Sequence, residues 1–385
     1  MTVLAPQATA RAGESLSGDT QGAAPVDSWT QPVFNGALLD AARGGDAAFV
    51  QQMLDLAQEP GRGLNVHEAA RKRDSETGLT ALESCIVAGC VAGFDLLLPF
   101  SDLSESSRPR RGRPPLTIAA FFGHAALVER LLPLSNPADL DHIGATSLLW
   151  AAHNHANHAL EVCRMLLPVS DANFSCPALS HGETPFQLAI SRNDPEWVET
   201  FLPYVDLNAK RLSHRSDMTP LMWAAHKEAD QSLKALLAAG ADSRAQGSAA
   251  LSAISAMMIA AAQEKPECAL ALVPVSDLAQ RDKDGLTALH YALDAGREEA
   301  ARALLGAMAP PCAAADRLMA IADEVKFRDS ARMPRLLALR DQTDAFLESC
   351  ALAWEIRAQA VSGAGPNSAE NENSLPAARR WPRSL

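Results

Sequence analysis

Apolar residues along this chain recur at the spacing of short amphipathic helices, and these helices come in pairs. The stretch from Asp282 to Leu305 contains two such faces. The first is formed by Leu289, Ala292 and Leu293, and the second by Ala300, Ala303 and Leu304. Gly285 in the opening turn tolerates a left-handed backbone, and Gly296 separates the two helices. Because two helices this short cannot bury their own apolar faces, the unit needs neighbours on both sides.

The same helical pair recurs along most of the chain and can be aligned on the residue that precedes each first helix. This anchor position is occupied by Gly36, Thr80, Pro114, Thr146, Thr184, Thr219, Ser255 and Thr287. A hydrophobic residue follows two positions after each anchor, and a small residue five positions after it. The anchors are 44, 34, 32, 38, 35, 36 and 32 residues apart, which predicts eight repeats with modest loop insertions.

A second motif, Leu-Leu-Pro-x-Ser-Asp, closes most of these repeats. It occurs, with small variations, at residues 97–102, 131–136, 166–171, 201–206 and 272–277. We predict that proline ends the second helix of each pair, because it lacks the amide that would continue the helix. The Ser and Asp side chains are expected to cap the turn that follows.

This unit resembles an ankyrin repeat, whose pattern includes Asp-x-x-Gly-x-Thr-Pro-Leu-His-x-Ala-Ala. The matching residues are Asp282, Gly285, Thr287, Leu289, His290, Ala292, Gly296, Leu304 and Leu305. Ala288 replaces the proline, Leu293 replaces the second alanine, and the usual ending Leu-Leu-x-x-Gly-Ala-Asp occurs only at Leu236 to Asp242. The resemblance implies an all-α ankyrin repeat solenoid that binds other proteins, in which His290 hydrogen-bonds neighbouring backbone.

These patterns divide the chain into four segments. We expect a disordered leader at 1–33, the ankyrin repeat array at 34–306, a C-terminal helical cap at 307–361 and a disordered tail at 362–385. The cap contains apolar residues such as Phe346 and Trp354, which we expect to cover the exposed end of the stack. Its predicted helices are Ala313–Val325, Met333–Arg340 and Thr343–Val361.

Composition narrows the function without identifying it. The chain has 34 basic and 46 acidic side chains and a net charge of −12, which does not favour bulk binding of nucleic acid. Its seven cysteines are scattered without a Cys-x-x-Cys pair, which favours a reducing compartment. No apolar run reaches transmembrane length, so we expect no membrane insertion, and we expect a monomer. No phosphate-binding loop, nucleophile elbow or His-Glu-x-x-His motif is present, so we predict no catalytic, cofactor or metal site.

The leader suggests a biological context. It is polar, it lacks an apolar core, and the first lysine of the chain is Lys72. Alanine and arginine are both abundant, as in proteins of GC-rich bacteria. These features favour a bacterial effector that is made in the bacterial cytoplasm and secreted into a host cell. The alternatives are a non-secreted ankyrin adaptor or scaffold, and an enzyme whose catalytic residues lie in the C-terminal helices.

Two local clusters allow more than one interpretation. The stretch from Arg108 to Pro115 is similar to an AT-hook, but Gly112 and Pro114 fall on the repeat pattern. Two further interpretations of this stretch are therefore possible: a basic loop that contacts an acidic partner, or a loop that contacts only solvent. The histidines at 153, 155 and 158 lack the spacing that places two metal ligands on one helix face, which favours a contact role over metal binding.

The resemblance also implies which residues contact a partner. In the family these lie four, three and one positions before the anchor and seven and eight positions after it. Adjacent phenylalanines cannot both face the core side of one helix, so at least one of Phe121 and Phe122 is expected to be exposed. We predict that an acidic protein surface or peptide binds across the second to sixth repeats. The candidate residues are Arg110, Arg111, Arg113, Phe121, Phe122, His142, Ile143, His153, Asn154, His181, Glu183, Arg192, Arg215, Met218, His226 and Lys227.

Overall fold

The structure is a computed structural model of the full chain. The described residues are 29–103, 112–154, 158–179, 182–209, 211–213, 216–247, 253–308, 314–328 and 332–362. The predicted tail and most of the predicted leader therefore lie outside the described residues. The chain divides into two compact units, Met1–Asp171 and Ala172–Leu385, and each is described by itself.

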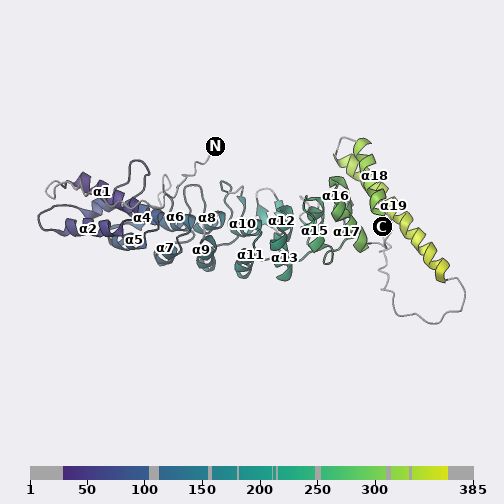
Figure 1. The fold of residues 1–385 in the computed structure, drawn as a ribbon, viewed down its shortest axis with the longest axis horizontal. Coiled ribbons are helices and arrows are strands. Elements are labelled where there is room, and N and C mark those ends of the chain that lie inside the picture. The colour runs from purple at the N-terminus through teal and green to yellow at the C-terminus, as the bar shows by residue number, and fades with distance from the viewer. Residues whose placement is uncertain are drawn as a thin grey trace, which may run out of the picture. The chain divides into compact units, whose positions relative to one another are not determined.

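The first unit is a stack of helical pairs (Figure 1). Within it the first helices α1, α4, α6 and α8 pack on one another in order, and each first helix packs on its own second helix. The elements are α1 (Gln31–Gly44), α2 (Ala47–Gln58), α3 (Val66–Arg71), α4 (Ala81–Ala88), α5 (Val91–Leu97), α6 (Pro115–Phe122), α7 (Ala125–Leu131), α8 (Ser147–His153) and α9 (Ala159–Leu166).

Helix α3 was not predicted from the sequence. It lies in the long insertion between the first two anchors, and Asn65 caps its start by accepting a hydrogen bond from the Glu68 amide at 3.2 Å. Its Ala69 and Ala70 are buried, so the insertion adds a short packed helix to the edge of the array.

The second unit continues the same pattern and adds two C-terminal helices (Figure 1). A short hairpin of strands β1 (Arg211–Ser213) and β2 (Ser216–Met218) pairs antiparallel, with Arg211 opposite Met218. The helices are α10 (Pro185–Ser191), α11 (Pro195–Phe201), α12 (Pro220–His226), α13 (Asp230–Ala238), α14 (Ala256–Ala262), α15 (Glu267–Leu272), α16 (Ala288–Ala295), α17 (Glu298–Met308), α18 (Ala314–Arg328) and α19 (Arg332–Ser362).

The anchor residues from Thr80 to Thr287 lie directly before their first helices, as predicted, but the alignment is wrong for Gly36, which lies inside α1. Thr80 Oγ1 accepts a hydrogen bond from the Glu83 amide at 3.2 Å, and the Thr80 amide donates to Glu83 Oε2 at 2.8 Å. Thr146, Thr184, Thr219 and Ser255 cap their helices through the same side-chain bond. Two residues before the anchor the backbone is left-handed, with φ of 83° at Gly144 and 57° at Ala253, which replaces the glycine in its repeat.

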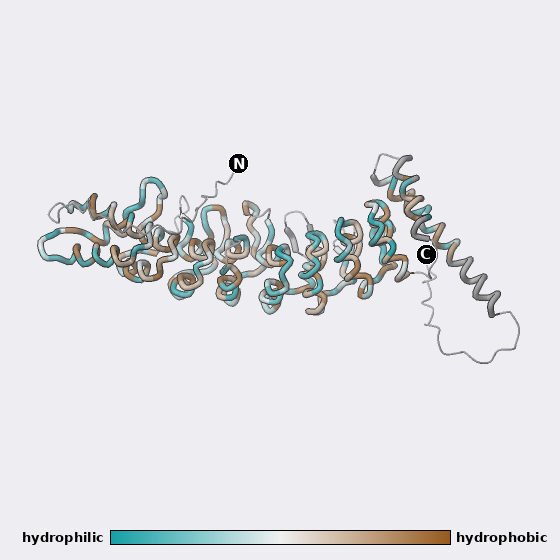
Figure 2. Tube along the Cα trace, viewed as in Figure 1, coloured by the Kyte–Doolittle hydropathy of each residue, from teal (hydrophilic) through white to brown (hydrophobic). Residues whose placement is uncertain are grey.

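The hydrophobic residue two positions after each anchor forms the core. All eight of these residues are at most 3% exposed. They are Leu38, Leu82, Leu116, Leu148, Phe186, Leu221, Met257 and Leu289. Brown apolar segments alternate with teal polar ones along the helical pairs (Figure 2), as expected when each helix buries one face. The all-α repeat fold predicted from the sequence is confirmed.

Four copies of the Leu-Leu-Pro-x-Ser-Asp motif end the second helix in one turn of 3₁₀ helix, as at Leu132–Leu134 and Leu202–Tyr204, and in the copy at 272–277 the corresponding residues form a turn. The proline lies in this short helix, so the α-helix ends just before it. The predicted aspartate caps are present, because Asp206 Oδ1 accepts a hydrogen bond from the Asn208 amide at 2.9 Å and Asp277 Oδ1 one from the Ala279 amide at 3.1 Å. The predicted serine caps are wrong for Ser170 and Ser276, whose buried Oγ atoms have no hydrogen-bond partner.

The C-terminal helices pack against the last repeat, where α18 contacts α16 and α17 and α19 contacts α16. Arg335 Nη2 lies 2.8 Å from Asp294 Oδ1, and Arg340 Nη1 donates to the Asp284 carbonyl at 2.6 Å. The predicted helices Met333–Arg340 and Thr343–Val361 are wrong as separate elements, because both belong to α19. No proline or glycine lies between them, so nothing in the local sequence interrupts the helix.

Candidate partner-binding surface

The predicted contact residues that the structure describes are divided between the two units, and only some of those in each unit contact one another. Arg113, Phe121, Phe122, His142, Ile143, His153 and Asn154 lie in the first unit. Glu183, Arg192, Met218, His226 and Lys227 lie in the second. The remaining candidates, Arg110, Arg111, His181 and Arg215, lie outside the described residues, as does most of the AT-hook-like stretch.

Arg113 is the centre of the cluster in the first unit. It lies one residue before the Pro114 anchor, and its guanidinium carbon is 4.7 Å from the centroid of the Phe121 ring and 4.1 Å from that of Trp150. The two rings meet edge to face, with centroids 5.2 Å apart. A guanidinium this close to two aromatic faces gains cation–π stabilisation from both. The aromatic rings therefore hold Arg113 in place.

Asp141 interacts with both Trp150 and Arg113 in this cluster. Its side chain is fully buried, and Oδ2 accepts a hydrogen bond from Trp150 Nε1 at 2.7 Å and lies 3.8 Å from Arg113 Nε. Burial lowers the pKa of the Arg113 guanidinium, and the negative charge of Asp141 counteracts part of that shift. Arg113 Nε is buried and has no hydrogen-bond partner. The guanidinium is thus oriented by the two rings and by Asp141, while the Arg113 side chain as a whole remains 29% exposed.

Sequence reasoning missed Asp141 and Trp150. A signal was available, because an aspartate five positions before the anchor and an aromatic residue four positions after it occur together twice. In the other case Tyr291 Oη donates to Asp282 Oδ2 at 2.7 Å. This shared geometry joins the turn to the first helix within a repeat.

Phe122 is exposed, as predicted for at least one of the two phenylalanines. Its side chain is 38% exposed and stacks on His124, with ring centroids 6.0 Å apart. His153 lies on the other side of the cluster, with its ring centroid 5.9 Å from that of Trp150. Asn154 Nδ2 donates to the Phe121 carbonyl, so Asn154 also ties two repeats together. Phe122 is therefore the apolar side chain of this cluster that a partner can reach.

A related cluster surrounds Trp223 in the second unit. Lys227 Nζ lies 4.7 Å from the Trp223 ring centroid and 2.9 Å from Glu183 Oε1. Trp223 Nε1 donates to the Gln187 carbonyl at 3.2 Å, which fixes the ring against the preceding repeat. Burial lowers the pKa of His226, Lys227 lowers it further, and Glu183 opposes both. His226 is therefore neutral near pH 7.

Arg192 and Met218 lie apart from the Trp223 ring in their contacts. The Arg192 guanidinium carbon is 4.0 Å from the ring centroid of Trp197, which belongs to the second helix α11. Met218 ends strand β2 directly before the Thr219 anchor and is partly buried. Arg192 thus packs toward the second helix of its own pair.

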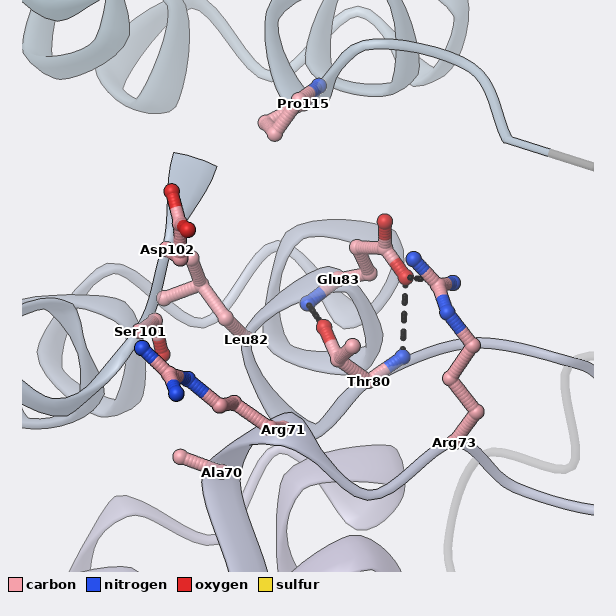
Figure 3. A pocket seen from close by; sticks show the side chains of 9 residues that line it. All are labelled: Ala70, Arg71, Arg73, Thr80, Leu82, Glu83, Ser101, Asp102 and Pro115. Atoms are coloured by element: carbon pink, nitrogen blue, oxygen red, sulfur yellow. Dashed lines mark hydrogen bonds and ion pairs between the residues drawn. The ribbon is translucent and has the colours of Figure 1, made fainter. Parts of the chain in front are cut away.

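A small pocket in the first unit shows how the polar groups at a helix start satisfy one another (Figure 3). Glu83 accepts hydrogen bonds from the Thr80 amide at 2.8 Å and from Arg73 Nη1 at 3.1 Å. Its side chain is 3% exposed, so the carboxylate is committed to the capping box. The pocket is thus explained by the local structure of the repeat.

Within the described residues, no group of three or more His, Cys, Asp or Glu side chains is placed to hold a metal ion. None of the described helices is long and apolar enough to cross a membrane. Cys85, Cys163 and Cys268 are buried, and burial raises the pKa of the Cys85 and Cys268 thiols to about 12.

The stacked helical pairs, the capped anchors and the left-handed turn glycines define a helical repeat protein. Residues 157–247 and 243–313 match the family model of ankyrin repeats, so this part of the chain consists of ankyrin repeats. Ankyrin repeats are modules of protein–protein interaction.

Further comparisons add context. A solved ankyrin repeat domain from Acinetobacter baumannii AYE is 22% identical, with a TM-score of 0.43, and the match covers 51% of this chain and 98% of that one. No curated protein matches the chain.

Proposed function

We propose that this chain binds an acidic protein partner through two clusters at its inter-repeat loops and first helices. The first consists of Arg113, Phe121, Phe122 and Trp150, and the second of Trp223, His226 and Lys227. The observation that carries the proposal is Arg113, whose guanidinium lies over two aromatic rings while its side chain remains 29% exposed.

A clamped arginine suits a carboxylate ligand for two reasons. Arginine loses side-chain freedom when it binds, and the Phe121 and Trp150 rings have already removed most of that freedom here. The planar guanidinium also matches a carboxylate in geometry, and such charge-assisted hydrogen bonds are stronger than neutral ones. Phe122 lies next to Phe121 and offers an exposed ring, of the kind that anchors many interfaces.

Lys227 contributes differently. It is already paired with Glu183 at 2.9 Å, so a partner carboxylate must compete with an internal one. Its main effect is therefore expected on the rate of association and on the salt dependence of that rate, with little effect on the final affinity.

The binding prediction uses a labelled peptide of alternating Glu and Leu, with a Gln/Leu peptide as the uncharged control. Arg113→Ala and Phe122→Ala are each expected to weaken binding of the Glu/Leu peptide by about 1–3 kcal/mol in an anisotropy titration. Arg113→Lys should behave like Arg113→Ala, because lysine cannot stack as a plane or donate as a fork.

The matched control is Leu140→Ala, which removes a side chain that is 48% exposed in the same unit. Circular dichroism must show that each variant is folded. Unchanged affinity in an Arg113→Ala/Phe122→Ala double variant, or equal binding of the two peptides, contradicts the proposal.

The composition of the leader supports a finer proposal, that the protein is a bacterial effector exported into host cells. Deleting residues 2–30 is then expected to abolish translocation in a reporter-fusion assay and to leave peptide binding unchanged. The full-length fusion and a fusion lacking residues 363–385 are the controls. Normal translocation of the leader deletion contradicts the effector role and favours an adaptor that stays in the producing cell.

A further inference from the structure

The ends of the second helices carry a row of exposed apolar residues that the proposed binding clusters do not use. In Leu-Leu-Pro-x-Ser-Asp the position x is apolar or aromatic in every copy. In the second unit Tyr204 is 43% exposed and Val275 is 46% exposed. The repeat between them ends without proline and exposes Ala238 and Ala239 at the corresponding place. We call Tyr204, Ala239 and Val275 the apolar row.

These residues belong to three successive repeats. Helices α11, α13 and α15 pack side by side, and each residue of the row follows the end of one of them (Figure 1). The first unit shows the same feature by itself, with Leu134 and Val169 each 49% exposed. If the residues at x were buried, packing in the hydrophobic core would explain why they are apolar. They are exposed, so core packing does not explain it. A repeated exposed apolar position points to a contact surface.

The surroundings of the apolar row are acidic. Two or three residues after each member comes an exposed aspartate, namely Asp206, Asp242 or Asp277. In each aspartate Oδ1 accepts a backbone amide hydrogen bond at 2.9–3.1 Å, which holds the carboxylate in one orientation. Within three residues of each member of the row, this aspartate is the only charged residue in the sequence. Among the described side chains of α11, α13, α15 and the adjoining loops, exposed acids outnumber exposed bases by eight to six. The acids are Asp194, Glu196, Glu199, Asp206, Asp242, Glu264, Glu267 and Asp277, and the bases are Lys227, Lys234, Arg244, Lys265, Arg281 and Lys283.

The negative charge of these aspartates indicates which kind of partner binds the apolar row. A second copy of the chain would place like-charged carboxylates opposite one another, which opposes association. A basic partner gains from the same carboxylates. Neighbouring helices lie about 8–10 Å apart, and an α-helix rises about 10.5 Å in seven residues. A partner helix with apolar residues in heptads therefore presents one apolar residue to each repeat, whereas a β-strand turns alternate side chains away.

We propose that the apolar row and its aspartates dock a basic amphipathic α-helix of another protein. The surface is distinct from the Arg113 and Trp223 clusters and takes a partner of opposite charge. The protein then has two recognition surfaces, one for an acidic partner and one for a basic helix, and can hold both together. If experiments exclude one of these two surfaces, the proposal for the other surface still stands.

The test uses the full chain and a labelled helical peptide of about three heptads, with Leu at the a and d positions and Lys at the others. Its counterpart carries Glu in place of Lys. The Lys peptide is expected to bind at least about tenfold more tightly than the Glu peptide. Tyr204→Ser/Val275→Ser should weaken binding of the Lys peptide by about tenfold or more. Asp206→Asn/Asp277→Asn keeps the amide-accepting oxygens and should weaken binding and flatten its salt dependence.

The matched control is Val33→Ser with Glu76→Gln and Glu129→Gln, which makes comparable changes at exposed positions of the first unit and should bind as the parent chain does. Equal binding of the Lys and Glu peptides, or parent-like binding by the Tyr204→Ser/Val275→Ser variant, overturns the proposal. Sedimentation provides a second readout. If the parent chain sediments as a dimer and the Tyr204→Ser/Val275→Ser variant as a monomer, the apolar row binds a second copy of the chain. That result also overturns the proposal.

Discussion

Replacing Leu221 by alanine is expected to destabilise the array by about 2–4 kcal/mol. Leu221 lies on α12 two positions after its anchor and is 1% exposed. First helices α10 and α14 pack on either side of α12, so the cavity left by the truncation has no free side chain to fill it. In a repeat array each unit is stabilised by its neighbours, and the loss therefore spreads beyond one repeat.

The measurement is urea unfolding followed by circular dichroism, with Leu270→Ala as the matched control. Leu270 lies on α15 of the same unit but is 41% exposed, so the same chemical change should shift the midpoint little. Deletion of residues 363–385 should also have little effect. Equal shifts for Leu221→Ala and Leu270→Ala would mean that the alignment of the repeats on Thr219 is wrong.

The repeats could be predicted from the sequence because the signals that define them are local. A threonine caps the helix that starts directly after it, and the residue two positions later is buried in every repeat. Neither feature depends on what the rest of the chain does. The same locality explains why the aspartate caps at Asp206 and Asp277 were predicted, since each aspartate accepts from a backbone amide two residues on.

The predictions that were incomplete concern contacts between distant residues. Lys227 and Arg113 were identified from position alone as cations available to a partner, yet the structure places Glu183 at 2.9 Å from the first and Asp141 at 3.8 Å from the second. Glu183 is 44 residues away from Lys227 in the sequence. A repeat pattern gives the place of a side chain within its own unit and does not say which neighbour across the stack neutralises it.

The two proposed surfaces follow from different parts of the repeat. The clusters of Arg113 and Trp223 arise near the anchor, where loops and first helices meet. The apolar row arises where proline closes the second helix. Sequence changes at one do not alter the packing at the other, so an ankyrin array can acquire a second recognition surface without losing the first.

Asp141 provides the prediction with the largest expected effect. Its Oδ1 accepts the amides of Ile143 and Ala145 at 3.0 and 2.9 Å, and its Oδ2 accepts Trp150 Nε1 at 2.7 Å. Asp141→Ala removes every one of these acceptors at once and leaves Arg113 without its counter-charge. Removing one partner from a buried charged network typically costs about 3–5 kcal/mol. Because the Arg113 side chain is 29% exposed, water offsets part of its loss, and most of the effect comes from the unpaired N–H groups.

Asp141→Asn separates these contributions and gives the prediction its control. Asparagine keeps an oxygen for the amides of Ile143 and Ala145, but its amide group cannot accept from Trp150 Nε1 and carries no charge for Arg113. We therefore expect Asp141→Asn to destabilise less than Asp141→Ala. Hydrogen exchange should show the amides of Ile143 and Ala145 protected in the asparagine variant and unprotected in the alanine variant. The equivalent amides of Asp284 and Leu286, bound by Asp282 in the other unit, should keep their protection in both. If Asp141→Ala leaves Ile143 and Ala145 as protected as in the parent chain, Asp141 does not organise this turn, and the clamp on Arg113 must depend on the aromatic rings alone.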